Sequence, residues 1–96
     1  MAKIYKYKIG PNENSIIKGR IAVPIKVGWQ NDDLCVWCMV SEQLAEIKIK
    51  FHIVPTGCEF DFLKGMVYLD TIQDGIFVWH IFYEIIERPG GKKRDN

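Results

Sequence analysis

Two cysteines three residues apart, Cys35 and Cys38, are the first residues whose spacing could do chemistry. A C-x-x-C can supply half of a zinc site or a redox-active thiol pair. The surrounding residues, LCVWCMV over 34–40, are typical of a buried strand, where positions i and i+3 point to opposite faces. The third cysteine and the two histidines do not stand at a matching zinc spacing. We therefore predict two buried, unreactive cysteines, no metal site and no cofactor.

A second candidate is the row Lys48, Lys50 and His52, which alternate along one face of the strand predicted for residues 46–57. Such a row could bind phosphate, with a hydroxyl from Thr56 and a backbone N–H from Gly57 at its end. The alternative is that the lysines protect an edge strand from aggregation.

Three further residues complete the predicted ligand-binding set. Arg20 and Lys26 could neutralise phosphates together with the lysine row, and an aromatic side chain could stack on a base. Trp37 is the aromatic residue in the middle of the predicted sheet, where it either packs in the core or lines a pocket.

The sequence shows no set of residues whose types and spacing predict catalysis. His80 and Glu84 share one face of the last predicted strand, but four residues along a strand span roughly 13 Å. His80 is then either a hydrogen-bonded, half-buried histidine or a catalytic base. The nucleophile-elbow, P-loop, dinucleotide-binding and H-E-x-x-H motifs are all missing from the sequence. We expect a protein that is not an enzyme.

The composition is typical of one small, soluble domain. The 96 residues are 48% hydrophobic and 26% charged, with a formal net charge of +1. Near-neutrality argues against general nucleic-acid binding, and no apolar run approaches the roughly 18 residues that span a bilayer. The N-terminus lacks a signal-peptide core, and an odd number of cysteines argues against a secreted disulfide framework. These features predict a cytoplasmic protein.

The charges are unevenly spread along the chain. Residues 1–26 hold six basic side chains and one acidic side chain, whereas residues 27–87 hold three basic and ten acidic. The asymmetry leaves room for a local anion site. The alternative is that opposite charges on different strands pair at the surface.

Alternating hydrophobic residues predict an all-β fold of about six short antiparallel strands in a small sandwich or barrel-like domain. The predicted strands are 3–9, 20–30, 34–40, 46–57, 66–72 and 76–86. Apolar residues on both sides make 34–40 a central strand, and Pro24 indicates an edge strand or a bulge. Residues 1–87 form the domain and 88–96 a flexible polar tail. The last strand is apolar on both faces, so it lies between two layers or meets another subunit of a homodimer or larger oligomer.

Several stretches together resemble a family of small single-domain phage and prophage proteins. They are the opening aromatic-basic strand, the T-G after residue 55, the Tyr-x-x-Thr at 68–71 and the closing FVWHIF. On this chain the shared positions are Trp37, Thr56, Gly57, Tyr68, Thr71, Phe77, Val78, Trp79, His80 and Phe82.

The resemblance implies phage origin and action inside an infected bacterial cell, where small non-enzymatic proteins often counter host defence. From it we expect a protein that sequesters a small anionic, nucleotide-derived signal such as a cyclic dinucleotide. The alternative is a protein-interaction module that inhibits a host defence protein or serves as a minor phage assembly part.

Overall fold

A computed structural model describes residues 1–10 and 14–88 of the chain and contains seven β-strands and no helix in them. The strands are β1 (Ala2–Lys8), β2 (Asn14–Gly19), β3 (Ile21–Gln30), β4 (Asp33–Ser41), β5 (Ile47–Pro55), β6 (Val67–Asp74) and β7 (Phe77–Glu87). All pairings between them are antiparallel. The predicted all-β class is confirmed.

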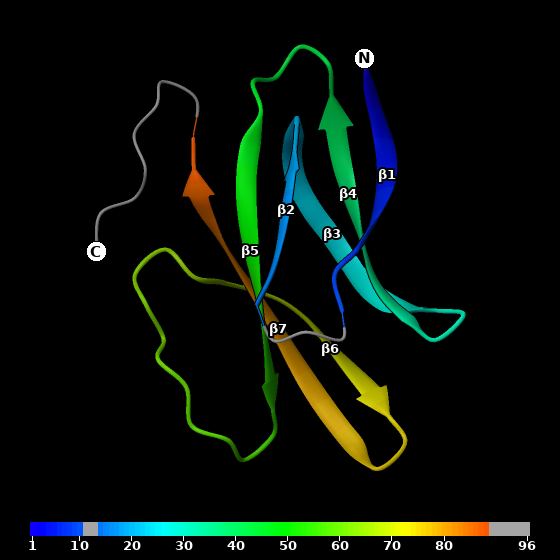
Figure 1. Ribbon diagram of the computed structural model, residues 1–96, viewed down its shortest axis with the longest axis vertical. Coiled ribbons are helices and arrows are strands. Elements are labelled where there is room, and N and C mark those ends of the chain that lie inside the picture. The colour runs from blue at the N-terminus through cyan, green and yellow to red at the C-terminus, as the bar shows by residue number, and fades with distance from the viewer. Residues whose placement is uncertain (11–13, 89–96) are drawn as a thin grey trace.

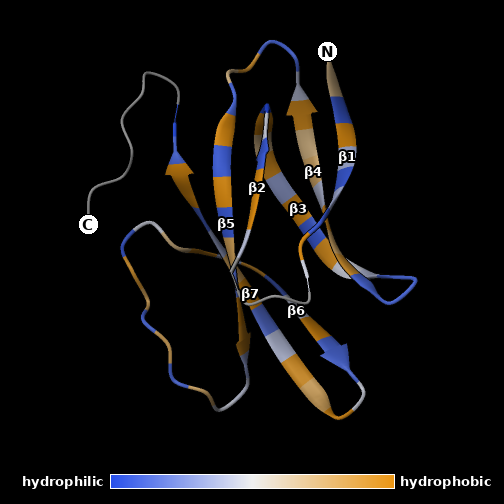
Figure 2. Cartoon of the chain, in the orientation of Figure 1, coloured by the Kyte–Doolittle hydropathy of each residue, from blue (hydrophilic) through white to orange (hydrophobic). Residues whose placement is uncertain are grey.

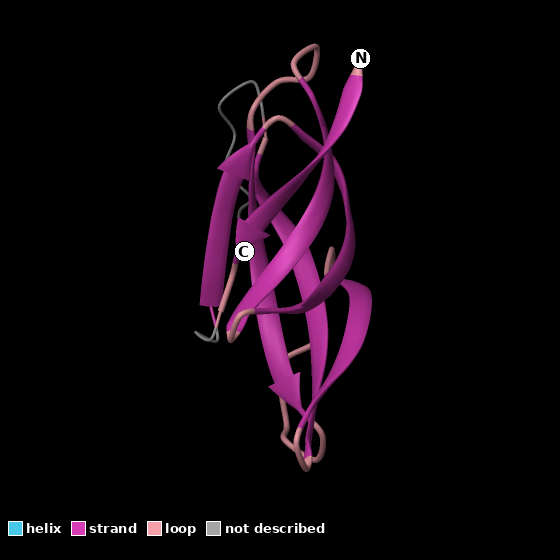
Figure 3. Cartoon of the chain, turned by 90° about the vertical axis from the view of Figure 1, so that its right-hand side faces the viewer, coloured by secondary structure: helices cyan, strands magenta, loops and turns pink. Residues whose placement is uncertain are grey.

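The strands form two sheets that pack face to face (Figures 1 and 3). Sheet A has the order β1-β4-β3, and sheet B has the order β2-β5-β7-β6. The chain enters sheet A with β1, crosses to sheet B with β2 and returns to sheet A with β3. Both sheets keep open edges, so the fold is a sandwich and not a closed barrel.

The core lies between the sheets and follows the period-2 pattern of the strands (Figure 2). Ile49 and Phe51 of β5, Val36 and Cys38 of β4, and Ile81 of β7 are fully buried there. The side chains between them in sequence point to the outer faces. Each strand therefore presents one row of side chains to the core and another to the surroundings.

Strand positions were partly predicted. Residues 34–40 are the central strand of sheet A, and Pro24 lies on the edge strand β3, where the pairing with β4 shifts register on both sides of it. The structure has seven strands where about six were expected, and β2 is the additional one. Of its residues 15–19 only Ile17 is buried, so little alternation marks this short strand in the sequence.

Within the chain, β7 has contacts on both of its faces. Its inner row packs on the core, while part of its outer row is covered by the chain's own loop between β5 and β6. The rings of Phe60, Phe62 and Tyr68 surround Phe82, with centroid distances of 5.2, 6.0 and 5.7 Å. Packing within the chain therefore covers the part of this face around Phe82, and contact with another subunit stays a prediction. Of the predicted tail, residues 89–96 lie outside the described residues.

Candidate functional site

The eight predicted ligand-binding residues fall in three separate places. The row Lys48, Lys50 and His52, followed by Thr56 and Gly57, lies on the outer face of sheet B. Lys26 and Trp37 lie side by side on the outer face of sheet A. Arg20 directly precedes β3, at the end of that strand away from Lys26. The structure therefore does not join them in one site.

The lysine row lies on β5, an inner strand of sheet B, so the edge-strand alternative is wrong. Acidic residues of the neighbouring β7 compensate much of its charge. Lys48 pairs with Glu87 at 3.4 Å, and His52 Nε2 lies 2.9 Å from Glu84 Oε1. Glu84 is the buried member of this pair, with 6% of its surface exposed. Surface pairing of opposite charges, the plainer expectation for the uneven charge, therefore operates here.

Thr56 takes part in a hydrogen-bonded chain on sheet B rather than standing free. Its Oγ1 lies 2.7 Å from His80 Nε2 and donates to the carbonyl of Val78 at 3.3 Å. His80 Nδ1 lies 3.1 Å from Thr71 Oγ1, which in turn lies 2.6 Å from the Tyr68 hydroxyl. His80 is thus a half-buried histidine bonded through both ring nitrogens, which favours the structural alternative over a catalytic base.

The two cysteines of the C-x-x-C point to opposite faces of β4, as predicted. Cys38 is completely buried in the core and Cys35 is buried on the other side. Burial raises the pKa of the Cys38 thiol to about 12. A thiol this hard to ionise is a poor nucleophile and a poor metal ligand. Among the described residues, no cluster of three or more histidine, cysteine or acidic side chains could hold a metal ion.

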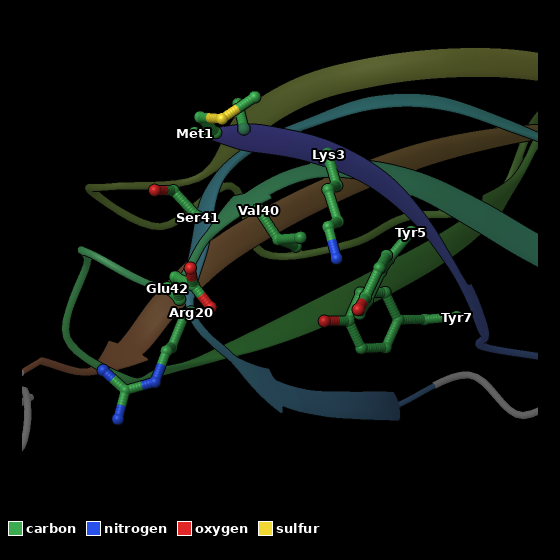
Figure 4. A pocket seen from close by; sticks show the side chains of 9 residues that line it. Met1, Lys3, Tyr5, Tyr7, Arg20, Val40, Ser41 and Glu42 are labelled. Carbon is green, nitrogen blue, oxygen red and sulfur yellow. The ribbon is translucent and has the colours of Figure 1, made fainter.

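A cleft of about 380 Å³ opens where β1 leaves the cover of sheet B (Figure 4). Along the inward face of β1, Ile9 is buried, Tyr7 is half-buried, and Tyr5 and Lys3 are exposed. The strand therefore diverges from the opposite sheet toward its N-terminus. The cleft is lined by Met1, Ala2, Lys3, Tyr5, Tyr7, Arg20, Val40, Ser41 and Glu42.

The polar groups that line this cleft come from three segments of the chain. Lys3, Tyr5 and Tyr7 share a face because they alternate along β1, and Figure 4 shows the Lys3 ammonium directed toward the two rings. Arg20 arrives from the start of β3, where its guanidinium donates to the carbonyl of Leu44 at 2.6 Å. Glu42 adds a carboxylate from the turn after β4. The lining therefore combines two cations, one anion and two phenol rings.

Tyr7 is half-buried in the wall of the cleft. Its hydroxyl would lie only 2.6 Å from a Cβ placed on Gly19, so glycine at that position leaves room for the ring. Burial, with smaller contributions from Cys38 and Tyr5, raises the pKa of Tyr7 above its usual value of 10.0. The phenol therefore stays protonated at neutral pH and can donate a hydrogen bond.

Sequence reasoning missed Lys3, Tyr5 and Tyr7 as candidates. Their alternation along residues 3–9 predicted a strand, but an aromatic row at period 2 is the ordinary pattern of a core-facing strand. The signal that distinguishes this row is Lys3, a charge on the same face as the tyrosines.

Fold and cleft together define a small all-β sandwich with an open, cationic and aromatic cleft at one edge. The chain belongs to the family described as a domain of unknown function (DUF7352), and the match covers residues 1–91. No curated protein and no solved structure matches the chain. Within residues 1–10 and 14–88, no helix has the length and apolarity needed to cross a membrane.

Proposed function

We propose that the chain is a non-enzymatic binding protein that captures a small anionic ligand of the nucleotide class in the cleft beside β1. The observation that carries the proposal is the grouping of Lys3 and Arg20 with the paired rings of Tyr5 and Tyr7 around one concave space. Cations suit phosphate groups, and phenol rings suit the flat face of a base.

Each group of the cleft has a defined part in the proposed complex. The Lys3 ammonium, which has no ion pair among the described residues, is available to a phosphate without breaking an existing contact. Tyr7, held protonated by its raised pKa, donates a hydrogen bond to an anionic oxygen. Tyr5 is half-exposed and offers a ring face to a base. Arg20 adds long-range attraction while its guanidinium stays on Leu44.

The proposal includes a biological setting. By its resemblance to small phage and prophage proteins, the chain would act in the cytoplasm of an infected bacterium and counter host defence. Sequestering a cyclic dinucleotide-like signal requires tight binding and no turnover, which agrees with a cleft built from binding groups. A homodimer or larger homo-oligomer belongs to the same proposal, because a second copy over an open cleft would enclose the ligand.

Isothermal titration with a panel of cyclic dinucleotides, linear dinucleotides, mononucleotides and inorganic phosphate tests the proposal. We expect binding of at least one nucleotide, and a loss of roughly ten- to a hundredfold in affinity for Lys3→Gln, which removes one charge-assisted hydrogen bond. Tyr5→Leu should cost roughly tenfold through lost stacking. Lys64→Gln, which removes an equal charge from the exposed loop between β5 and β6, is the matched control.

The same titration separates the cleft from the predicted row on sheet B. Lys50→Gln should leave the affinity unchanged if the ligand lies in the cleft. A loss with Lys50→Gln and none with Lys3→Gln would move the site to the row formed by Lys48, Lys50, His52, Thr56 and Gly57. Failure of every ligand to bind, with circular dichroism showing folded protein, would sink the proposal altogether.

A second candidate function is a protein-interaction module. The observation that favours it is the aromatic cluster on the outer face of sheet B, where Phe62 is 67% exposed beside Phe82. Exposed aromatic groups are frequent at protein interfaces. A stoichiometric partner recovered from bacterial lysate by the unmodified chain, lost with Phe62→Ser and retained with Lys3→Gln, would favour this function over nucleotide capture.

A further inference from the structure

A second binding surface lies on the outer face of sheet A, on the other side of β1 from the cleft. Its centre is Trp37 on β4, which is paired in register with Lys6 of β1 and with Lys26 of β3. Neighbouring strands lie about 4.8 Å apart, so the three residues form a row about 10 Å wide with the indole between two lysines. We call this row the Trp37 platform.

The indole has room to lie along the sheet. The next position of β3 on the same face as Lys26 is Gly28, and a Cβ there would lie 3.6 Å from Cζ3 of Trp37. A side chain at Gly28 would therefore occupy the space beside the ring. Trp37 is half-buried, whereas both flanking lysines are exposed. The arrangement is a flat aromatic surface with a cation on each side.

The charge of this face differs from the near-neutral balance of the whole chain. Three lysines, Lys6, Lys8 and Lys26, point outward from β1 and β3, and the carboxylates near them lie at the rim. Asp33, the first residue of β4, pairs with Lys8 at 3.3 Å, and Asp70 of sheet B pairs with Lys26 at 3.5 Å. The pair of Lys8 and Asp33 is exposed and of small net worth, so a phosphate can replace its carboxylate at little cost. Lys26 is also exposed, whereas only 22% of the Asp70 side chain is; Asp70 keeps the backbone N–H of Val27 as a partner if a phosphate takes its place beside Lys26.

We propose that the Trp37 platform binds single-stranded nucleic acid by stacking one base on the indole while Lys6 and Lys26 contact the phosphates on either side. Protein surfaces that hold single strands without reading their sequence combine two elements: cations that contact the phosphates and aromatic rings on which the bases stack. Duplex nucleic acid does not fit this mode, because its bases are already stacked inside the helix. This proposal departs from the expectation of no general nucleic-acid binding for single strands only.

Fluorescence anisotropy with a labelled single strand of about 10 nucleotides, a length within the range found for such surfaces, measures this binding. We expect Trp37→Leu to lower affinity roughly tenfold without changing the salt dependence. Lys26→Gln should reduce the slope of log affinity against log salt by about 0.7, the share of one phosphate contact on a single strand. Lys64→Gln, away from the face, should change neither quantity.

Further variants keep the test independent of folding and of the proposed cleft. Lys6→Gln with Lys26→Gln alters only exposed side chains, so it reports on binding even if Trp37→Leu unfolds. Lys3→Gln, on the opposite side of β1, should leave single-strand binding intact whether or not the cleft takes up a nucleotide. The proposal is overturned if the single strand fails to bind in low salt, if a duplex binds equally well, or if size-exclusion chromatography shows that Trp37 instead holds a second copy of the chain.

Discussion

The carboxylate of Asp70 on β6 accepts a hydrogen bond from the backbone N–H of Val27 on β3, with Oδ2 and N 3.0 Å apart. The two strands are edges of different sheets, so this bond ties the sandwich together along one side. The second oxygen, Oδ1, accepts from the backbone N–H of Thr71 at 2.9 Å. One side chain thereby satisfies two main-chain donors at the register shift of β6.

Asp70→Ala should lower the free energy of unfolding by about 1–3 kcal/mol, because the N–H of the buried Val27 loses its acceptor. Asp70→Asn keeps an oxygen in the same place and should cost less. Urea denaturation measures both. Asp61→Ala, which removes a carboxylate from an exposed loop, is the control and should stay within about 0.5 kcal/mol of the unmodified protein. Equal losses at positions 61 and 70 would contradict the role of the inter-sheet bond.

The buried pair of His52 and Glu84 should matter more than the exposed pair of Lys48 and Glu87 on the same two strands. Glu84→Ala should cost about 2–3 kcal/mol of unfolding free energy, since it removes the buried acceptor of His52. Glu87→Ala should cost less than about 1 kcal/mol, because solvent already screens that pair. Denaturation of the two variants in the same buffer is the measurement, and a larger effect at Glu87 would refute this ranking.

The buried thiol of Cys38 predicts a loss of stability in alkaline solution. Its pKa is about 12 in the folded protein and near 9.0 in the unfolded chain. As pH rises above about 9, the unfolded state releases the proton first, so unfolding becomes more favourable by about 1.4 kcal/mol per pH unit until about pH 12. Tyr7, whose pKa is also raised, acts in the same direction above pH 10.

Urea denaturation across this range should show a shallower decline for Cys38→Ala than for the unmodified protein. Between about pH 6 and 8 the two stability curves should run parallel, since the thiol is protonated in both states there. An equally steep alkaline decline in the variant would show that other groups account for it.

The three cysteines should separate by reactivity with a thiol reagent such as Ellman's. Cys58 is exposed, whereas Cys35 and Cys38 are buried on opposite faces of β4. We expect one of the three thiols to react in the native protein and all three after denaturation. Rapid native reaction of a second thiol, or recovery of a Cys35–Cys38 disulfide after mild oxidation, would show that the C-x-x-C is more than a coincidence of spacing.

Local patterns were enough to predict much of the fold. The alternation of residues 47–53 predicted β5 and its inward row, because a strand's side-chain direction repeats every two residues regardless of its neighbours. The same two-residue period predicted that the side chains of Cys35 and Cys38 would point to opposite faces of their strand. The weakly marked β2 escaped prediction, since its place in the sheet depends on pairing with β5 rather than on its own sequence.

What the sequence alone determined was the class of fold and the inert cysteine pair, since both follow from side-chain direction along single strands. The tertiary structure decided which strands are neighbours, and through this it decided where charges meet. Pairing with β7 brought Glu84 and Glu87 beside the lysine row. Register across sheet A set Lys6 and Lys26 on either side of Trp37. The two lysines precede Trp37 by 31 and 11 positions in the sequence, so no local pattern connects the three residues. The cleft exists because β1 diverges from sheet B, a relation between two sheets that no period along one strand contains.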